Sequence, residues 1–383
     1  MKTTHHLKTR FPILLTLLFL IQFPTEGRAQ QNLNKSRELS NYFEGVLSDD
    51  PEQPVVNILT YLENGKSGFV FNEGFGTISR ENKVPVSKSQ TFKIASITKM
   101  FTAVVIMQLY EENRIGLDQP VYKYLKEVDF VRFDSLHIHN GTSWGKQITI
   151  RQLLSHRSGL ADVFTDAEEE FNGYVFQHPQ TQWNPEKLFD MYFAFGLNEM
   201  AKSGPGKAFA YTDVGYFLLG LCIEEITGDD LATQYRKRIL EPLGMEHTYF
   251  EYYEDPVDSI PQAHAFLGST DATAAINTSF DWAGGGLVSN TRDLAIFIRG
   301  LFNHRLFENK STLQMMVDKD RYGYGTGVLH FDEKTWYGHF GYWGSGLYYN
   351  PENELTICIS INQVNPPIDF QKIIKTAGKM LTN

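Results

Sequence analysis

Nearly every position between Thr102 and Leu109 is apolar, so this segment has no polar face. A helix that is apolar on all sides lies in a core rather than at a surface. The pattern therefore predicts a central buried helix from Ser96 to about Asn113, which ends before Gly116.

The patterns on either side of this helix divide the chain into three parts. Alternating or apolar runs ahead of it predict two strands, at residues 54–61 and 68–71. The middle of the chain has helical spacing at residues 150–155, 185–195, 216–226 and 231–240. After about residue 280, segments rich in Gly and aromatic residues have strand patterns, at residues 324–331, 346–349 and 355–362.

This order of strands, helices and strands predicts a fold of the α/β class, of α+β type, with one sheet split by a helical insertion. We expect the sheet to come from about residues 40–95 and 275–383, and a helical lobe from about 96–274. No Pro- or Ser-rich linker, low-complexity tract or repeat interrupts the sequence. Residues 30–383 are therefore expected to form a single domain.

Residues 1–29 have the pattern of a signal peptide. Three basic residues precede an apolar run at 11–23, and Gly27 and Ala29 are small residues of the kind found at cleavage sites. The apolar run is too short to span a bilayer comfortably. We predict cleavage after Ala29 and export to the periplasm or the medium, without stable insertion in the membrane.

The charge and the cysteines narrow the function classes. Removing residues 1–29 takes away four basic residues and one acidic residue, which changes the formal net charge from −10 to −13. An acidic protein without basic clusters is a poor candidate for binding nucleic acid or anionic membranes. Cys222 and Cys358 form no disulfide scaffold, and we expect buried free thiols, with one long-range bridge as the alternative. The sequence does not indicate an oligomeric state.

The candidate chemistry begins with Ser96 and Lys99, which share one face of the predicted helix, one turn apart. Burial disfavours the ammonium ion and lowers a lysine pKa, leaving an amine that can accept the serine proton. We therefore expect a rate that rises between about pH 6 and 8 as Lys99 loses its proton. The structural alternative is that Ser96 caps the helix and Lys99 extends to solvent.

A second Ser-x-x-Lys pair, Ser143 and Lys146, lies among turn-forming residues with no helix behind it.

Three further segments have candidate roles. Tyr211 precedes an apolar helix, where its phenol is either a packing group or a proton relay beside Ser96. His339 lies between Gly338 and Gly341, and glycines allow a backbone to approach a ligand closely. Residues 153–160 read as a structural helix end with a glycine cap.

The histidine pair and an acidic run in the middle of the chain are weak candidates for catalysis. His137 and His139 are a possible metal pair, but no acidic ligand or further histidine follows within the next few positions. On a strand, both would lie on one exposed face. The acidic run at 166–170 reads as a solvated loop or a helix start. We therefore expect no metal and no organic cofactor.

The order of these segments resembles the serine β-lactamase and penicillin-binding-protein superfamily. The segments are Ser96-x-x-Lys99, Tyr211-x-Asp213 and His339-x-Gly341. The similarity is to the branch that contains class C β-lactamases, serine DD-peptidases and related esterases, and it covers about residues 40–380. Residues 153–160, 241–245 and 282–287 are also typical of that branch. The resemblance implies a central antiparallel sheet flanked by helices, an all-helical lobe, and an active site between them.

The resemblance also implies a role for each residue. Ser96 is the expected acylated nucleophile, Lys99 its proton acceptor, and Tyr211 the proton relay to the leaving group and to the deacylating water. The backbone amides of Ser96 and Tyr342 are the expected oxyanion hole. Asp213, His339 and Gly341 are the expected substrate-binding residues.

Two departures from the family pattern affect the substrate. His339 stands where many members carry lysine, and Asp213 where many carry asparagine. The resemblance, with these departures, therefore implies an exported serine hydrolase acting through an acyl-enzyme on a small ester, amide or D-amino-acid peptide, with no metal or organic cofactor. The alternatives are a β-lactamase or DD-carboxypeptidase proper, a penicillin-binding sensor with little turnover, and a metallohydrolase around His137 and His139.

Overall fold

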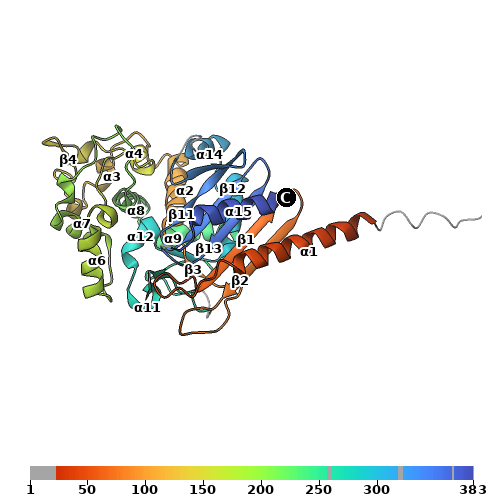
Figure 1. The fold of residues 1–383 in the computed structure, drawn as a ribbon. Coiled ribbons are helices and arrows are strands. Elements are labelled where there is room, and N and C mark those ends of the chain that lie inside the picture. Colours follow the sequence, from red (N-terminus) through yellow and green to blue (C-terminus); the bar gives the residue numbers. More distant parts are fainter. Residues whose placement is uncertain (1–22, 257–259, 318–321, 365, 383) are drawn as a thin grey trace, which may run out of the picture.

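A six-stranded antiparallel sheet runs through the computed structural model, which describes residues 23–256, 260–317, 322–364 and 366–382. The strand order is β10-β11-β12-β13-β1-β2, so the first two strands of the chain pair with the last one. These strands are β1 (Asn57–Asn64), β2 (Phe69–Gly76), β10 (Gly327–Phe331), β11 (Lys334–Gly341), β12 (Ser345–Asn350) and β13 (Leu355–Ser360). The sheet is therefore built from both ends of the chain, as Figure 1 shows by its red and blue strands.

Short strands form three smaller sheets. One has the order β3-β9-β6, from β3 (Phe92–Lys93), β9 (Leu287–Ser289) and β6 (Tyr249–Phe250). The other two are hairpins, of β4 (Ile138–His139) with β5 (Thr142–Ser143) and of β7 (Phe266–Leu267) with β8 (Thr270–Asp271). The β3-β9-β6 sheet matters most for function because β3 leads directly into the segment that carries Ser96.

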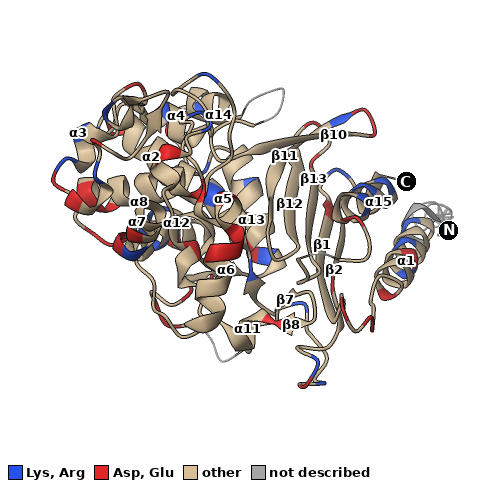
Figure 2. Ribbon diagram, turned by 60° about the vertical axis from the view of Figure 1, so that its left-hand side comes forward, with Lys and Arg blue, Asp and Glu red and all other residues tan. Residues whose placement is uncertain are grey.

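Helices cover both faces of the large sheet and form a lobe beside it (Figures 1 and 2). The helices are α1 (Phe23–Glu44), α2 (Thr98–Glu111), α3 (Tyr122–Leu125), α4 (Ile150–Leu154), α5 (Val163–Asp166), α6 (Glu168–Gln177), α7 (Pro185–Ala194), α8 (Asp213–Thr227), α9 (Leu231–Tyr235), α10 (Glu241–Leu243), α11 (Ala272–Ala275), α12 (Trp282–Gly285), α13 (Thr291–Phe302), α14 (Lys310–Met316) and α15 (Phe370–Thr382). Helices α1 and α15 pack on one face of the sheet, and α13 packs on the other. The predicted fold class is confirmed.

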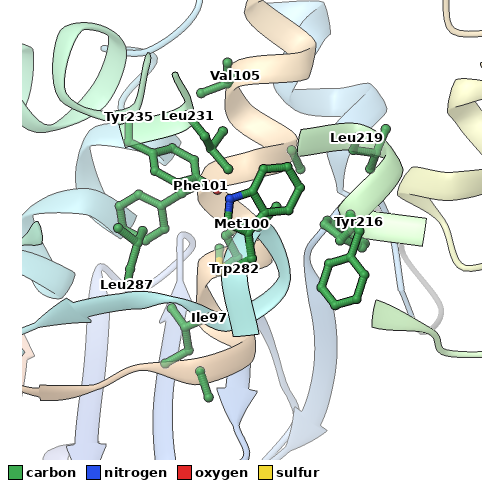
Figure 3. Close-up of a cluster of buried hydrophobic side chains, with 14 of the residues drawn as sticks. Ile97, Met100, Phe101, Val105, Tyr216, Leu219, Leu231, Tyr235, Trp282 and Leu287 are labelled. Carbon is green, nitrogen blue, oxygen red and sulfur yellow. The ribbon is translucent and has the colours of Figure 1, made fainter. Parts of the chain in front are cut away.

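Helix α2 is the centre of the larger core. Its side chains from Thr98 to Met107 are all buried, as its lack of a polar face predicts. Phe101 stacks on Phe297 of α13, with ring centroids 3.8 Å apart, and Figure 3 shows Trp282 and Tyr235 packed beside the same helix. Because α2 contacts α8, α12 and α13, its first turn is held in place from several sides.

Most predicted elements occur close to their expected positions. The helices expected in the middle of the chain correspond to α4, α7, α8 and α9, and residues 236–240 continue α9 as a π-helical turn. Helices α13 and α15 were not singled out, although Leu294, Phe297, Ile298 and Leu301 of α13 have helical spacing and are buried. The acidic run at 166–170 does begin a helix, α6, and Glu168 to Glu170 are exposed.

The structure also shows the state of the two cysteines and the beginning of the described chain. Cys222 and Cys358 are free and buried, as predicted, so no bridge joins them. Residues 1–22 of the predicted signal peptide lie outside the described residues, and residues 23–29 form the start of α1. Within the described part of the chain, no helix is both long and apolar enough to cross a membrane.

Candidate active site

Ser96 lies in a single 3₁₀ turn, Ala95–Ile97, between β3 and α2. The turn reverses the chain so sharply that Ala95 adopts a φ of 45°, in the left-handed region that non-glycine residues rarely occupy. Such a conformation costs about 1–3 kcal/mol and persists only where the surrounding structure enforces it. The turn leaves Ser96 half-buried while both of its neighbours are buried. The strained turn thus exposes the hydroxyl that the sequence predicts to be the nucleophile.

Lys99 lies one turn further along, with its side chain completely buried. Its Nζ is 3.1 Å from Ser96 Oγ, 2.5 Å from Asp213 Oδ1 and 2.9 Å from the carbonyl oxygen of Gly284. An ammonium group has three protons, and these three acceptors account for all of them. The alternative in which Lys99 extends to solvent is therefore wrong.

The prediction that Lys99 has a lowered pKa is also wrong. Burial does lower the pKa of the amine, but the negative charge of Asp213 and the contacts with Asp213 and Tyr211 outweigh burial and raise it above its usual value. Nothing in the local sequence places a carboxylate beside Lys99, because Asp213 lies 114 positions away, so burial is the sole effect that the local pattern indicates. In the resting site Lys99 is a cation paired with Asp213.

Tyr211 presents its ring to the same ammonium group, with Lys99 Nζ 5.0 Å from the ring centroid. The phenol oxygen is buried and has no hydrogen-bond partner among the described residues. Burial raises the pKa of Tyr211 to about 12, although the charge of Lys99 opposes this shift. The phenol is therefore neutral at rest, and its unpaired hydroxyl is available to a substrate or a water molecule.

Asp213 is the first residue of α8, and its surroundings hold the carboxylate against Lys99. Its backbone N–H donates to Asp162 Oδ1 at 2.6 Å, which anchors the start of the helix. On the other side stands Gly284, where an added Cβ would lie 2.4 Å from Asp213 Oδ1 and 3.4 Å from Lys99 Nζ. Only glycine leaves room for this ion pair. The charge of Asp213 is thus already paired inside the protein.

His339 lies on β11 and belongs to a hydrogen-bonded chain that the sequence did not predict. The hydroxyl of Tyr322 is 3.1 Å from His339 Nε2 and 3.2 Å from His156 Nε2. The backbone fixes the direction of this chain, because the Thr212 N–H donates to His156 Nδ1 and His339 Nδ1 donates to the Phe340 carbonyl. His156 Nε2–H therefore donates to Tyr322, and Tyr322 donates to His339 Nε2.

This arrangement keeps His339 uncharged. Burial lowers the pKa of His339 to about 3, and the charge of Lys99 acts in the same direction. A neutral imidazole whose Nε2 already accepts a hydrogen bond offers no positive charge to a substrate carboxylate. His156, from the segment 153–160, also supports the site, because its ring lies 4.1 Å from that of Tyr211.

The end of β11 is pressed against the turn that carries Ser96. A Cβ at Gly341 would lie 2.3 Å from the carbonyl oxygen of Ile94 and 3.1 Å from Ala95 Cβ, so a glycine is required there. Ser345, paired with Gly341 across the sheet, also donates to the Ile94 carbonyl at 3.0 Å. This contact brings the residue after Gly341, Tyr342, next to the 3₁₀ turn, in keeping with the expected pair of backbone donors.

A further carboxyl group, Asp281, stands near these residues. It is half-buried and forms no hydrogen bond or ion pair through its side chain within the described part of the chain. Burial and the negative charge of Asp213 raise the pKa of Asp281 to about 7. The buried carboxyl of Asp162 has its pKa raised by the same two causes. The site therefore holds more acidic groups than Lys99 alone neutralises.

The other sequence candidates lie outside this site. His137 is buried, not exposed as expected, and its Nε2 pairs with the Ser203 carbonyl at 3.0 Å, while His139 pairs with the Ala201 carbonyl at 3.2 Å. The described residues contain no group of three or more side chains able to hold a metal ion. Ser143 lies on the surface outside this site, where its hydroxyl donates to the backbone carbonyl of Asp134.

Sequence reasoning missed the supporting residues Tyr322, His156, Asp162 and Asp281 as parts of the site. His156 lies in segment 153–160, whose pattern is typical of the family that the sequence resembles. Tyr322, Asp162 and Asp281 carry no local signal, because each contributes through a contact that the tertiary fold makes. Gly284 did have a signal in the sequence, because it belongs to segment 282–287, whose three glycines are typical of the family that the chain resembles. The structure supplies the physical reason for that glycine.

Comparison with known proteins gives consistent results. The family model described as Beta-lactamase matches residues 63–377. Among curated proteins, Protein flp of Staphylococcus aureus (strain MW2) is 28% identical over 272 residues, which are 67% of this chain and 50% of that protein. The chain thus spans about half the length of this relative.

Solved structures with the same fold include two hydrolases. D-amino acid amidase from Ochrobactrum anthropi SV3, complexed with D-phenylalanine, has a TM-score of 0.72 at 22% identity, covering 90% of this chain and 99% of that one. D-stereospecific amidohydrolase from Streptomyces sp. has a TM-score of 0.70 at 25% identity, covering 92% and 98%.

Proposed function

This chain is a serine hydrolase that belongs to the Beta-lactamase family, and on that premise we propose that it is an exported enzyme acting through an acyl-enzyme on small amides, esters or D-amino-acid peptides. The observation that carries the proposal is the 3.1 Å contact between Lys99 Nζ and Ser96 Oγ, at the strained turn that presents the serine. The unpaired phenol of Tyr211 beside them supports a role in proton transfer to the leaving group.

The charges around the site favour substrates with a free amine over substrates with a free carboxylate. Asp213 carries the negative charge of the ion pair, and Asp281, whose pKa is raised to about 7, adds a second negative charge above neutral pH, whereas His339 is held neutral. A substrate carboxylate would meet acidic groups, while the cations near them, Lys93 and Lys99, are already paired with Glu251 and Asp213. A substrate ammonium group would meet an attractive field and could pair with the unbonded carboxyl of Asp281.

The similar structures support the same substrate class. One is an amidase for D-amino acids and the other a D-stereospecific amidohydrolase, by the names those proteins carry. A D-amino acid amide has a free amine and no carboxylate, which is the combination that this site accommodates. β-Lactams and acyl-D-Ala-D-Ala peptides carry a carboxylate instead. We therefore place β-lactam or DD-peptide hydrolysis second.

We predict that a short-chain nitrophenyl ester and a D-amino-acid amide are hydrolysed with at least about 10-fold higher kcat/KM than a chromogenic cephalosporin. The carboxylate of the cephalosporin would be left without a partner in the site, and an unpaired buried group costs about 1–3 kcal/mol. The measurement compares the three substrates on the wild type and on the double variant Asp213→Asn, His339→Lys. The ratio of cephalosporin to ester kcat/KM, taken at each enzyme's optimum pH, should rise in the double variant.

The ester serves as the internal control, since it carries neither an amine nor a carboxylate and reports general damage to the site. Efficient cephalosporin turnover by the wild type would refute the assignment of substrate class. An unchanged ratio in the double variant would do the same.

Export is proposed from the sequence pattern of residues 1–29. Expression of the full chain in a bacterium with a general secretion system should yield a periplasmic or secreted form whose first residue is Gln30. Edman sequencing or intact-mass analysis of that form provides the measurement. Recovery of only the full-length chain in the cytoplasm would contradict the proposal.

A further inference from the structure

The resting site raises a problem of proton transfer. The three protons of the Lys99 ammonium point to three acceptors, which are Asp213 Oδ1, the Gly284 carbonyl and Ser96 Oγ. An ammonium group has no lone pair, so it cannot accept the proton of Ser96 until it has given one away. A peptide carbonyl is too weak a base to take that proton, and Ser96 is the group that must be deprotonated.

Of the three partners, only Asp213 is able to receive the proton. We propose that Asp213 is a catalytic proton acceptor for Lys99, so that the base of this enzyme is the Lys99–Asp213 pair and not a free lysine amine. This inference rests on the proposed function, because it concerns the formation of the acyl-enzyme. It gives Asp213 a different role from that of a substrate-binding residue.

The proton steps balance as follows. Lys99 passes a proton to Asp213 Oδ1, which converts the ion pair into a neutral amine and a neutral carboxylic acid. The amine then takes the Ser96 proton while Oγ forms its bond to the substrate carbonyl carbon. On collapse of the tetrahedral intermediate, Tyr211 gives its proton to the departing amine or alcohol as the bond to the leaving group breaks. Tyr211 regains a proton from Lys99, and Asp213 returns its proton to Lys99.

At the end of these steps the serine proton has left with the leaving group, and the pair is ionised again. No oxidant, metal or other reactant is needed. The cost of the first step is reduced by burial, because a site of low dielectric disfavours two separated charges relative to two neutral groups. The short contact of 2.5 Å means that the proton moves without rearrangement of either side chain.

The surroundings fix Asp213 for this role. Its helix start is tied to Asp162, and Gly284 excludes any side chain from the space around the pair. Other titratable groups that interact electrostatically with the pair come from several elements, and they are His156, Asp162, Tyr211, Tyr216, Asp281, Tyr322 and His339. Tyr211 contacts Lys99 through its side chain, and Asp162 accepts a hydrogen bond from the backbone N–H of Asp213.

The pair has a pH signature that a lone lysine lacks. With one mobile proton shared between the two groups, the active form persists across neutral pH, and kcat/KM for the ester should change by less than about 3-fold between pH 6 and 8. In Asp213→Asn the amine has no acceptor, so Lys99 must lose its proton to solvent. Below the Lys99 pKa of that variant, kcat/KM should fall about 10-fold per pH unit.

The experiment measures kcat/KM for the nitrophenyl ester from pH 5 to 10 on the wild type, Asp213→Asn, Asp213→Glu and the control Asp134→Asn, with thermal unfolding to verify that each variant is folded. Asp213→Glu keeps a carboxylate and should retain part of the flat profile. Asp134→Asn removes an exposed carboxylate that pairs with Lys146 outside the site, and its profile should keep the wild-type shape. In mixtures of H₂O and D₂O, the wild type should show a curved proton inventory from two moving protons, and Asp213→Asn a linear one.

Three results would overturn the inference. The first is a wild-type rate that rises about 10-fold per pH unit through neutrality, a result that needs no variant. The second is an Asp213→Asn profile that superimposes on that of the wild type. The third is the absence of Ser96-dependent turnover on all substrates, which would overturn the proposed function as well. The first two leave the serine hydrolase assignment intact, so the two failures are distinguishable.

Discussion

Replacing Ser96 by alanine should abolish covalent labelling by a fluorophosphonate and lower turnover by at least about 10³-fold. The expectation follows from the position of Ser96, the hydroxyl that lies 3.1 Å from Lys99 at a strained and half-exposed turn. Removing one member of a catalytic unit costs about as much as removing the whole unit, since the remaining groups have nothing to act on. Labelling followed on a gel, together with kcat/KM for the ester, gives the two readouts.

Ser143→Ala is the matched control. Ser143 begins the other Ser-x-x-Lys pair considered above, but its hydroxyl donates to the carbonyl of Asp134 on the surface. Its removal should leave labelling and turnover near wild-type values. If labelling survives Ser96→Ala and disappears with Ser143→Ala, the site has been assigned to the wrong serine.

Lys99→Arg should be as damaging as Lys99→Ala, although the arginine keeps the positive charge and the ion pair with Asp213. A guanidinium group does not release a proton in the range of enzyme activity, so it cannot serve as a base, alone or in a pair. It is also larger than the ammonium group in a completely buried space bounded by Asp213 and Gly284. We expect losses of at least about 10³-fold in kcat/KM for both variants.

Lys146→Arg provides the corresponding control, because Lys146 forms an exposed ion pair with Asp134 that an arginine can also make. Exposed surface pairs of this kind contribute little because solvent screens them, so neither stability nor activity should change measurably. Appreciable activity in Lys99→Arg would show that Lys99 has only a structural role. Circular dichroism on each variant separates a loss of base from a loss of fold.

Local sequence patterns predict the features of this protein that depend on interactions between residues close together in the chain. The lack of a polar face predicts the burial of α2, and the spacing of Ser96 and Lys99 predicts that they share one face of the chain. The actual geometry differs in one detail, since Ser96 lies in a 3₁₀ turn ahead of α2 and not in the helix itself. The sheet segments also follow from alternating patterns, whereas the order of the six strands does not.

The remainder depends on contacts between distant segments. Asp213 lies 114 positions from Lys99, and only the packing of α8 against α2 brings the two together. The sign of the Lys99 pKa shift therefore could not be obtained from the surroundings of Ser96 in the sequence. The same holds for Tyr322, which has no pattern of its own and acts by joining two histidines from different parts of the fold.

The strand order has a consequence for how the protein is made. Strand β1 lies between β2 and β13, and its partner residues on β13 are nearly 300 positions away, with Leu59 opposite Ser360. Chain entropy must be lost over that whole separation before the contact is formed, which makes such pairings slow. During synthesis β1 and β2 are made long before β13, so the edge of β1 stays unpaired until β13 has been made. Because β11, which positions His339, joins the same sheet through β12 and β13, the catalytic groups come together only after β13 has paired with β1. A chain that stops before β13 therefore lacks the strand that joins β12 to β1, and we expect it to show no hydrolase activity.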